Sequence, residues 1–142
     1  MATKIVVTGG AGFIGSNIAL TLEAQGHHIT VLDNFFSSSK ENLKGFKGEI
    51  IEHDVSQQCN IEGPIDAIIH EAAITDPRHE DDNETLTKNV EGFKNIIVLA
   101  KDKNAALVYA SSAAVYGNGP VPMKEEQDKD IGNAYAKSKW EM

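Results

Sequence analysis

Short apolar segments alternate along this chain with longer segments in which apolar residues recur every three or four positions. The short segments are rich in Val and Ile and predict strands at residues 4–8, 29–33, 49–52, 67–70 and 107–110. Two apolar stripes predict amphipathic helices, one formed by Ile14, Ile18 and Leu22 and the other by Leu86, Val90, Phe93, Ile97 and Ala100. Apolar strands separated by such helices are typical of a parallel sheet covered on both faces. The sequence therefore predicts a doubly wound α/β fold, and right-handed crossovers predict the strand order 3-2-1-4-5.

The length of 142 residues, of which 41% are hydrophobic, is sufficient for one domain around one core. Between the fifth strand and the end, residues 117–130 combine prolines with acidic residues and predict an irregular surface loop. Residues 133–142 then begin a helix so short that it is marginal without packing.

Charge and cysteine content exclude several classes of partner. Thirteen Lys and Arg against 21 Asp and Glu give a net charge of -8, and the basic residues form no cluster, so nucleic acid and anionic membrane surfaces are not expected partners. The single Cys59 excludes an intrachain disulfide. No apolar run approaches the roughly 20 residues that span a bilayer, and no signal-peptide pattern begins the chain. We expect a soluble cytoplasmic protein.

A glycine-rich turn follows the first strand and opens the first helix. Its sequence, TGGAGFIG from Thr8 to Gly15, contains GxGxxG starting at Gly10. Glycines allow the backbone to turn tightly and a pyrophosphate to approach the amides at a helix N-terminus. Asp33 ends the second strand 18 residues after Gly15, where a carboxylate can accept both ribose hydroxyls of NAD and would repel the 2'-phosphate of NADP. The alternative interpretation is a structural turn with a solvated Asp33.

A hydroxyl, a phenol and an amine are predicted to lie near one another at the carboxyl edge of the sheet. Tyr135 and Lys139 are four residues apart, so on a helix they share one face with side-chain bases about 6 Å apart. A tyrosine is a poor base at neutral pH unless a nearby cation stabilises its phenolate, and a lysine supplies that charge. Ser111 and Ser112 end the fifth strand, where a cofactor crevice is expected to open. Tyr and Lys at this spacing also arise by chance. The functional interpretation therefore depends on their expected position near Ser111 and Ser112 at the cofactor crevice.

Several motifs in register give the chain a family resemblance. They are TGGAGFIGS from Thr8, Asp33-Asn34, Asp54-Val55, His70-Glu71-Ala72-Ala73, NVEG from Asn89, SSAAVYG from Ser111 and YAKSK from Tyr135. In this order they resemble the extended short-chain dehydrogenases, and among those the NAD-dependent sugar epimerase/dehydratase family. The resemblance covers essentially the whole chain and implies a Rossmann fold with bound NAD.

The resemblance also implies residue roles. The implied cofactor-binding residues are Gly9, Gly12, Phe13, Ile14 and Gly15 at the pyrophosphate, Asp33 and Asn34 at the adenosine ribose, Asp54 and Val55 at the adenine, and Ala72 and Ala73 near the nicotinamide ribose, with Asn89, Tyr135 and Lys139 completing the set. The implied catalytic residues are Tyr135 as base, Lys139 and Ser112, the last hydrogen-bonding the reacting sugar hydroxyl.

The implied reaction removes the proton of a sugar hydroxyl and the hydride of the carbon that bears it, which gives a transient keto sugar. Return of the hydride to the other face of this intermediate inverts the carbon. Nucleotide-sugar dehydratases carry Asp-Glu where this chain has Ala113 and Ala114, and methyl groups cannot move protons. We therefore expect a nucleotide-sugar epimerase, similar either to UDP-glucose 4-epimerases or to ADP-heptose 6-epimerases. A dehydratase or dehydrogenase of the same family is the alternative.

Members of that family are about twice as long, and their C-terminal half supplies most of the sugar pocket. We accordingly expect residues 1–142 to form an NAD-binding domain that binds NAD without turning over a sugar alone. A non-catalytic NAD-binding module is a further alternative. In the family, helices corresponding to residues 84–103 and 133–142 pair subunits, which implies a possible homodimer.

The remaining polar residues are not expected to form a functional site. The five histidines, His27, His28, His53, His70 and His79, show no zinc-motif spacing, so no metal is expected. The acidic run Glu80-Asp81-Asp82 is expected to complement the start of a helix. Cys59 is expected in a polar loop with no role as a nucleophile.

Overall fold

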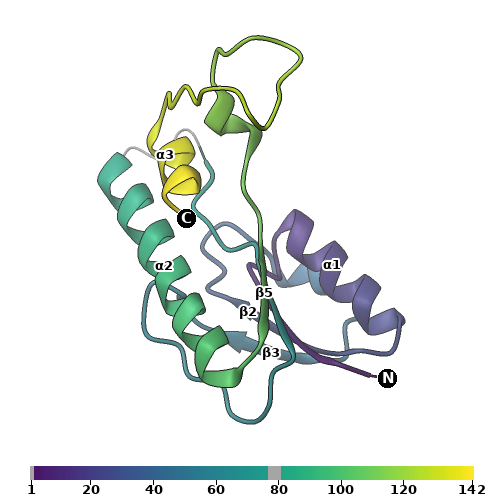
Figure 1. The fold of residues 1–142 in the computed structure, drawn as a ribbon. Coiled ribbons are helices and arrows are strands. Elements are labelled where there is room, and N and C mark those ends of the chain that lie inside the picture. Colours follow the sequence, from purple (N-terminus) through teal and green to yellow (C-terminus); the bar gives the residue numbers. More distant parts are fainter. Residues whose placement is uncertain (1, 77–80) are drawn as a thin grey trace. The chain divides into compact units, whose positions relative to one another are not determined.

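The computed structural model describes residues 2–76 and 81–142 and contains one five-stranded parallel sheet (Figure 1). The strands are β1 (Lys4–Thr8), β2 (His28–Asp33), β3 (Glu49–Glu52), β4 (Ala67–His70) and β5 (Ala106–Tyr109). Their order, β3-β2-β1-β4-β5, confirms the predicted topology. Val6 in the central strand lies beside Thr30 of β2 and Ile68 of β4.

Within the described residues, three α-helices and two short 3-10 helices connect or follow the strands. They are α1 (Phe13–Ala24), η1 (Lys40–Leu43), α2 (Asp82–Lys103), η2 (Ala113–Tyr116) and α3 (Ala134–Glu141). Residues 117–132 between η2 and α3 contain turns and bends and no helix or strand, as predicted. None of the helices in the described part of the chain is long and apolar enough to cross a membrane.

The chain divides into two compact units. The first unit comprises Met1–Ala72 and Glu91–Ala110, and therefore holds the whole sheet, α1 and the second part of α2. The second unit comprises Ala73–Val90 and Ser111–Met142, and holds the first part of α2 together with η2 and α3.

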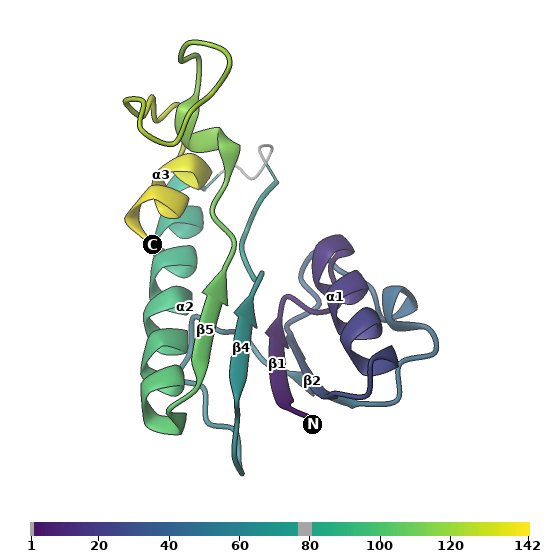
Figure 2. The same cartoon turned by 45° about the vertical axis from the view of Figure 1, so that its right-hand side comes forward.

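Alternate residues of the strands supply two hydrophobic clusters in the first unit. Val6, Leu32 and Ile68 pack with Ile96 and Leu99 of α2. Their sequence neighbours Val7 and Val31 pack with Ala19 of α1 on the other face. Because successive side chains of a strand point to opposite faces, the two helices cover opposite sides of the sheet (Figure 2). The doubly wound arrangement is therefore explained by strands that carry apolar side chains on both of their faces.

The predicted apolar stripes differ in part from the observed packing. Ile18 and Leu22 of α1 pack against the core as expected, but Ile14 is 58% exposed. Ile14 lies in the first turn of α1, beyond the end of β1, and so has no strand beneath it. At the edge strand β5, Val108 is 59% exposed.

Candidate functional site

The turn between β1 and α1 needs three of its glycines for internal packing. Gly9 has a φ of +64°, and a Cβ there would lie 2.7 Å from the backbone nitrogen of Ala72. A Cβ on Gly10 would lie 2.8 Å from Cγ1 of Val31, and one on Gly15 would overlap the carbonyl oxygen of Gly9. These positions therefore have structural reasons to be glycine, whatever the turn binds.

Gly12 has no comparable structural reason. It is the N-cap of α1, with φ -74° and ψ 176°, a conformation that any residue adopts. A Cβ there would meet only the Gly9 carbonyl oxygen, at 3.2 Å. The absence of a side chain at Gly12 thus keeps the space in front of the helix open, which is what close approach of a phosphate requires.

The same helix end offers hydrogen-bond donors. Gly12 provides no side-chain cap, and the first turn has no acidic residue. The amides of Phe13, Ile14 and Gly15 accordingly have no acceptor among the described residues. Together with the positive end of the helix dipole, these amides form a site suited to an anion.

Asp33 lies at the end of β2, beside this turn, and is almost fully buried. Its Oδ2 accepts a hydrogen bond from the amide of Ala11 at 2.9 Å. Its Oδ1 accepts from the Phe35 amide at 2.8 Å and from the Ser38 hydroxyl at 2.7 Å. The carboxylate is thus held in one orientation next to the turn, where the sequence predicted it.

Other cofactor candidates in the first unit follow the ends of neighbouring strands. Asn34 is exposed and accepts a bond from the Phe36 amide at 3.1 Å. Asp54 follows β3 and accepts from the Ser56 amide at 2.9 Å. The Val55 carbonyl accepts from Asn95 of α2 at 2.9 Å. The carboxyl ends of parallel strands meet at one edge, so these residues share that edge with the glycine turn.

Sequence reasoning missed several supporting residues in the first unit. Asn42 donates to the Ala11 carbonyl at 2.8 Å, which ties η1 to the glycine turn. The buried Thr8 hydroxyl lies 2.7 Å from Nδ1 of His70 and accepts from the Ala72 amide at 3.2 Å. Thr8 opens the glycine motif, but no local pattern indicated its partners, which are more than 60 residues away.

The second unit contains the three candidate catalytic residues. Ser112 is the N-cap of η2 and accepts a bond from the Ala114 amide at 3.2 Å, so it lies just after β5 instead of ending it. Tyr135 and Lys139 both belong to α3, and the Lys139 Nζ lies 6.0 Å from the centroid of the Tyr135 ring. Lys139 is buried, and α3 packs against η2. The structure therefore brings the two elements that carry these residues together.

A buried hydrogen-bond chain holds α3 in the second unit. The Asn89 side chain accepts from the Ile74 amide at 2.8 Å and donates to the Ile74 carbonyl at 3.1 Å. It also donates to the Ser138 hydroxyl at 3.0 Å, which in turn donates to the Tyr135 carbonyl at 2.7 Å. Ala73, another cofactor candidate, directly precedes Ile74. Asn133 caps α3 by accepting from the Ala136 amide at 2.7 Å, which anchors the short helix at its start.

The structure also shows the surroundings of the other polar residues named in the sequence analysis. No group of three or more His, Cys, Asp or Glu within residues 2–76 and 81–142 is arranged to hold a metal; His79 and Glu80 lie outside the described residues. Asp81 accepts from the Glu84 amide at 2.8 Å and so caps the start of α2. Cys59 lies in the loop between β3 and β4, as expected, but its partly buried side chain packs against the core, and burial raises the pKa of its thiol.

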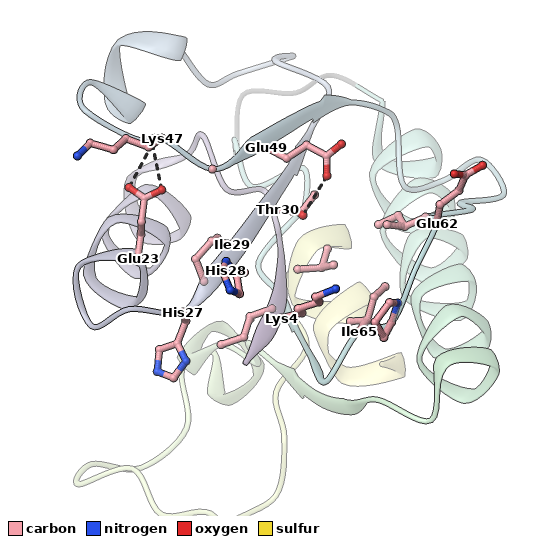
Figure 3. A pocket seen from close by; sticks show the side chains of 15 residues that line it. Lys4, Glu23, His27, His28, Ile29, Thr30, Lys47, Glu49, Glu62 and Ile65 are labelled. Carbon is pink, nitrogen blue, oxygen red and sulfur yellow. Dashed lines mark hydrogen bonds between the residues drawn. The ribbon is translucent and has the colours of Figure 1, made fainter. Parts of the chain in front are cut away.

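A cavity of about 550 Å³ lies at the opposite, amino edge of the sheet (Figure 3). Ile29 and Ile65 line its apolar part, and its rim is charged. Two acidic side chains of the rim bond within the protein: Glu23 accepts from the Lys47 amide at 3.0 Å, and Glu49 accepts from the Thr30 hydroxyl at 3.2 Å (Figure 3). Because these groups are already paired, we assign no ligand to this cavity.

Comparisons with known proteins agree with this geometry. Residues 5–142 match the profile of the NAD dependent epimerase/dehydratase family. Among curated relatives, UDP-glucuronic acid decarboxylase 1 of Xenopus tropicalis is 41% identical over 87% of this chain. ADP-L-glycero-D-manno-heptose-6-epimerase of Brachyspira hyodysenteriae is 39% identical over 96% of it.

Solved structures give the same result. The crystal structure of Helicobacter pylori ADP-L-glycero-D-manno-heptose-6-epimerase superposes with a TM-score of 0.91 at 33% identity over 99% of this chain. The Bordetella bronchiseptica enzyme WbmG, solved in complex with NAD and UDP, has a TM-score of 0.85 at 27% identity, also over 99%. The chain spans 30% and 46% of the two curated relatives and 49% and 48% of these two structures.

Proposed function

The chain belongs to the NAD-dependent epimerase/dehydratase family, and on that premise we propose that residues 1–142 form an NAD-binding domain. The observation that carries this proposal is the open N-terminus of α1, where Gly12 leaves the amides of Phe13, Ile14 and Gly15 accessible to a diphosphate. Besides these four residues, the proposed cofactor contacts are Gly9, Asp33, Asn34, Asp54, Val55, Ala72, Ala73, Asn89, Tyr135 and Lys139.

The proposed preference is for NAD over NADP. Asp33 is fixed beside the turn by three hydrogen bonds. Two of them use Oδ1, whereas Oδ2 accepts only one and keeps a second lone pair for a ribose hydroxyl. A 2'-phosphate would place negative charge against this buried carboxylate, which is electrostatically unfavourable. No arginine lies near Asp33 in the sequence to compensate.

The proposed chemistry assigns roles to the second unit. Tyr135 takes the proton from a sugar hydroxyl at its phenolic oxygen, and the Lys139 ammonium on the same helix stabilises the resulting negative charge. The Ser112 hydroxyl hydrogen-bonds the reacting oxygen. NAD, when bound, supplies a hydride acceptor for the carbon that bears the hydroxyl.

We propose epimerisation of a nucleotide sugar as the reaction of the whole protein, because Ala113 and Ala114 supply no acid or base for elimination of water. Among the relatives, UDP-glucuronic acid decarboxylases support a second candidate. Both epimerisation and decarboxylation can begin with oxidation of a sugar hydroxyl to a keto group. In the decarboxylation, the keto group lies β to the carboxylate and permits loss of carbon dioxide. Ser112, Tyr135 and Lys139 support the oxidation, which is the first step of both reactions.

The polypeptide of 142 residues is proposed to bind NAD without converting a sugar by itself, since it spans less than half the length of the relatives it matches. A cytoplasmic location and a homodimer formed through residues 84–103 and 133–142 complete the proposal. A non-catalytic NAD-binding module would share the cofactor site, and sugar turnover by the longer protein would exclude it.

The test is calorimetric titration of NAD and NADP into the 142-residue chain and its variants. We expect measurable NAD affinity and NADP binding at least tenfold weaker. Asp33→Ala removes charge-assisted hydrogen bonds worth about 1.5–3 kcal/mol, so it should weaken NAD binding by roughly 10- to 100-fold. Asp33→Asn should give an intermediate loss.

The matched control is Asp102→Ala, which removes an exposed aspartate of α2 and should leave NAD affinity unchanged. Thermal melts of each variant separate binding from unfolding, because Asp33→Ala also leaves the buried Ala11 amide without its acceptor. An unmodified chain that does not bind NAD, or that binds NADP equally well, contradicts the proposed cofactor site.

A further inference from the structure

Lys129 occupies an unusual environment for a lysine of an irregular surface segment. Its Nζ lies 4.4 Å from the centroid of the Tyr116 ring and 6.0 Å from that of Trp140. It also donates to the carbonyls of Glu125 at 2.7 Å and Gln127 at 3.1 Å. An ammonium has three N–H groups, so two backbone carbonyls and an aromatic face use all of its donors.

The flanking acidic residues do not hold this cation. Asp128 and Asp130 adjoin it in sequence, yet its hydrogen bonds within the described residues go to carbonyl oxygens. Asp130 instead bonds the end of η2: its amide donates to the Val115 carbonyl at 3.1 Å, and its carboxylate accepts from the Asn118 amide at 3.0 Å. The segment that carries Lys129 is thereby folded back onto η2, with the ammonium directed at the rings.

The two rings belong to the two elements that carry the candidate catalytic residues. Tyr116 ends η2, whose N-cap is Ser112, and Trp140 follows Lys139 on α3. η2 has four residues and α3 has eight, and helices this short depend on tertiary contacts to keep their place. A cation between the rings therefore joins η2 to α3 at a point close to both functional segments.

We propose that Lys129 is a positioning residue that holds the turn of Ser112 against the helix of Tyr135 and Lys139. This inference rests on the proposed function, since the alignment of these three residues matters only if they act together. It concerns the second unit alone, so its test requires neither NAD nor a sugar.

The test is nuclear magnetic resonance of the 15N- and 13C-labelled 142-residue chain. The ring current of Tyr116 should place the ε-methylene signals of Lys129 upfield of those of Lys124, an exposed lysine of the same segment. Lys129→Met keeps the length of the side chain and removes its charge. We expect it to shift the backbone amide signals of Ser112, Tyr135 and Lys139.

Lys129→Arg should restore the unmodified amide positions, because a guanidinium also stacks on aromatic rings. Lys124→Met is the matched control and should leave these signals unchanged. If Lys129→Met unfolds the chain, Tyr116→Leu provides a second measurement: it removes the ring, so the Lys129 methylene signals should move toward those of Lys124 and the three amide signals should shift, and unmoved amides in this folded variant would also overturn the proposal. Unshifted Lys129 methylene signals in the unmodified chain, or unmoved amides in a folded Lys129→Met variant, overturn the proposal.

Discussion

Substitution of Gly12 by alanine separates what the glycine turn does for the fold from what it does for a ligand. The backbone of Gly12 lies in an extended conformation that alanine adopts without strain. Its added Cβ would contact the Gly9 carbonyl oxygen at 3.2 Å, which requires an adjustment of a few tenths of an ångström. Gly15→Ala, by contrast, would drive a methyl group into the backbone of Gly9.

The expected effects on stability follow from this geometry. Alanine is a poorer N-cap than glycine by about 0.5–1 kcal/mol, whereas the loss of chain freedom in the unfolded state returns about 0.4–1 kcal/mol. Gly12→Ala should therefore change the free energy of unfolding by less than about 1 kcal/mol. Gly15→Ala should cost about 3 kcal/mol or more, because a backbone clash cannot relax through a side chain.

Gly12→Ala should affect NAD binding much more than it affects stability. A methyl group on Gly12 occupies the space in front of the amides of Phe13, Ile14 and Gly15, so a diphosphate can no longer reach them. We expect NAD affinity to fall at least tenfold, about 1.4 kcal/mol or more, in a variant that remains folded. Calorimetric titration and urea unfolding of the same preparations measure the two quantities.

Gly132→Ala is the matched control. A Cβ on Gly132 meets nothing within 4 Å, and neither stability nor NAD affinity should change appreciably. If Gly12→Ala binds NAD as tightly as the unmodified chain, the amides at the start of α1 do not hold the diphosphate. A large loss of stability in Gly12→Ala would show that the glycine is needed for packing.

Three further predictions concern packing and ionisation. Ser138→Ala leaves a donor of the buried Asn89 without an acceptor and should lower the free energy of unfolding by about 1–3 kcal/mol in urea titrations; an unchanged value would contradict this bond. Ile68→Ala should cost about 2–5 kcal/mol in the same assay, whereas Val108→Ala, at an exposed position, should change stability by less than about 0.5 kcal/mol; equal losses would refute the core assignment. Because burial raises the pKa of the Cys59 thiol, folded protein should be alkylated more slowly than urea-unfolded protein near neutral pH, and the rate should rise with pH. The same shift favours the folded state below the ordinary thiol pKa, and this contribution to stability is lost as pH rises through the raised pKa.

The strands and the glycine turn were predictable because their signals are local. The five apolar runs coincide with β1–β5 to within one residue at each end, and the strand order suggested by right-handed crossovers is the one observed. Asp33 was predictable for the same reason, since it ends a strand at a fixed distance from the glycines. Ile14 belongs to the same apolar stripe as Ile18 and Leu22 yet is 58% exposed, because periodicity shows which face of a helix is apolar but not how far along the helix that face is covered.

The side-chain contacts that support the candidate sites were not predictable. Asn89 and Ser138 are 49 residues apart, and neither residue type nor spacing singles out this pair. Lys129 lies among acidic residues, so the sequence favours a solvated or ion-paired lysine over one held between Tyr116 and Trp140. Such contacts depend on tertiary structure that brings distant segments together, which periodicity does not encode.

Gly12→Ala alters the first unit and Lys129→Met alters the second, so the two proposals can be tested separately. Gly12 and Asp33 belong to the first unit, and Lys129 makes its contacts within the second. Loss of NAD binding in Gly12→Ala with unmoved signals of Tyr135 would locate the defect at the diphosphate. Displaced signals of Tyr135 in Lys129→Met, with a smaller loss of NAD affinity than in Gly12→Ala, would locate the defect in the alignment of α3. A family member requires both capacities, so a substitution that impairs one alone identifies which part of the machinery each residue serves.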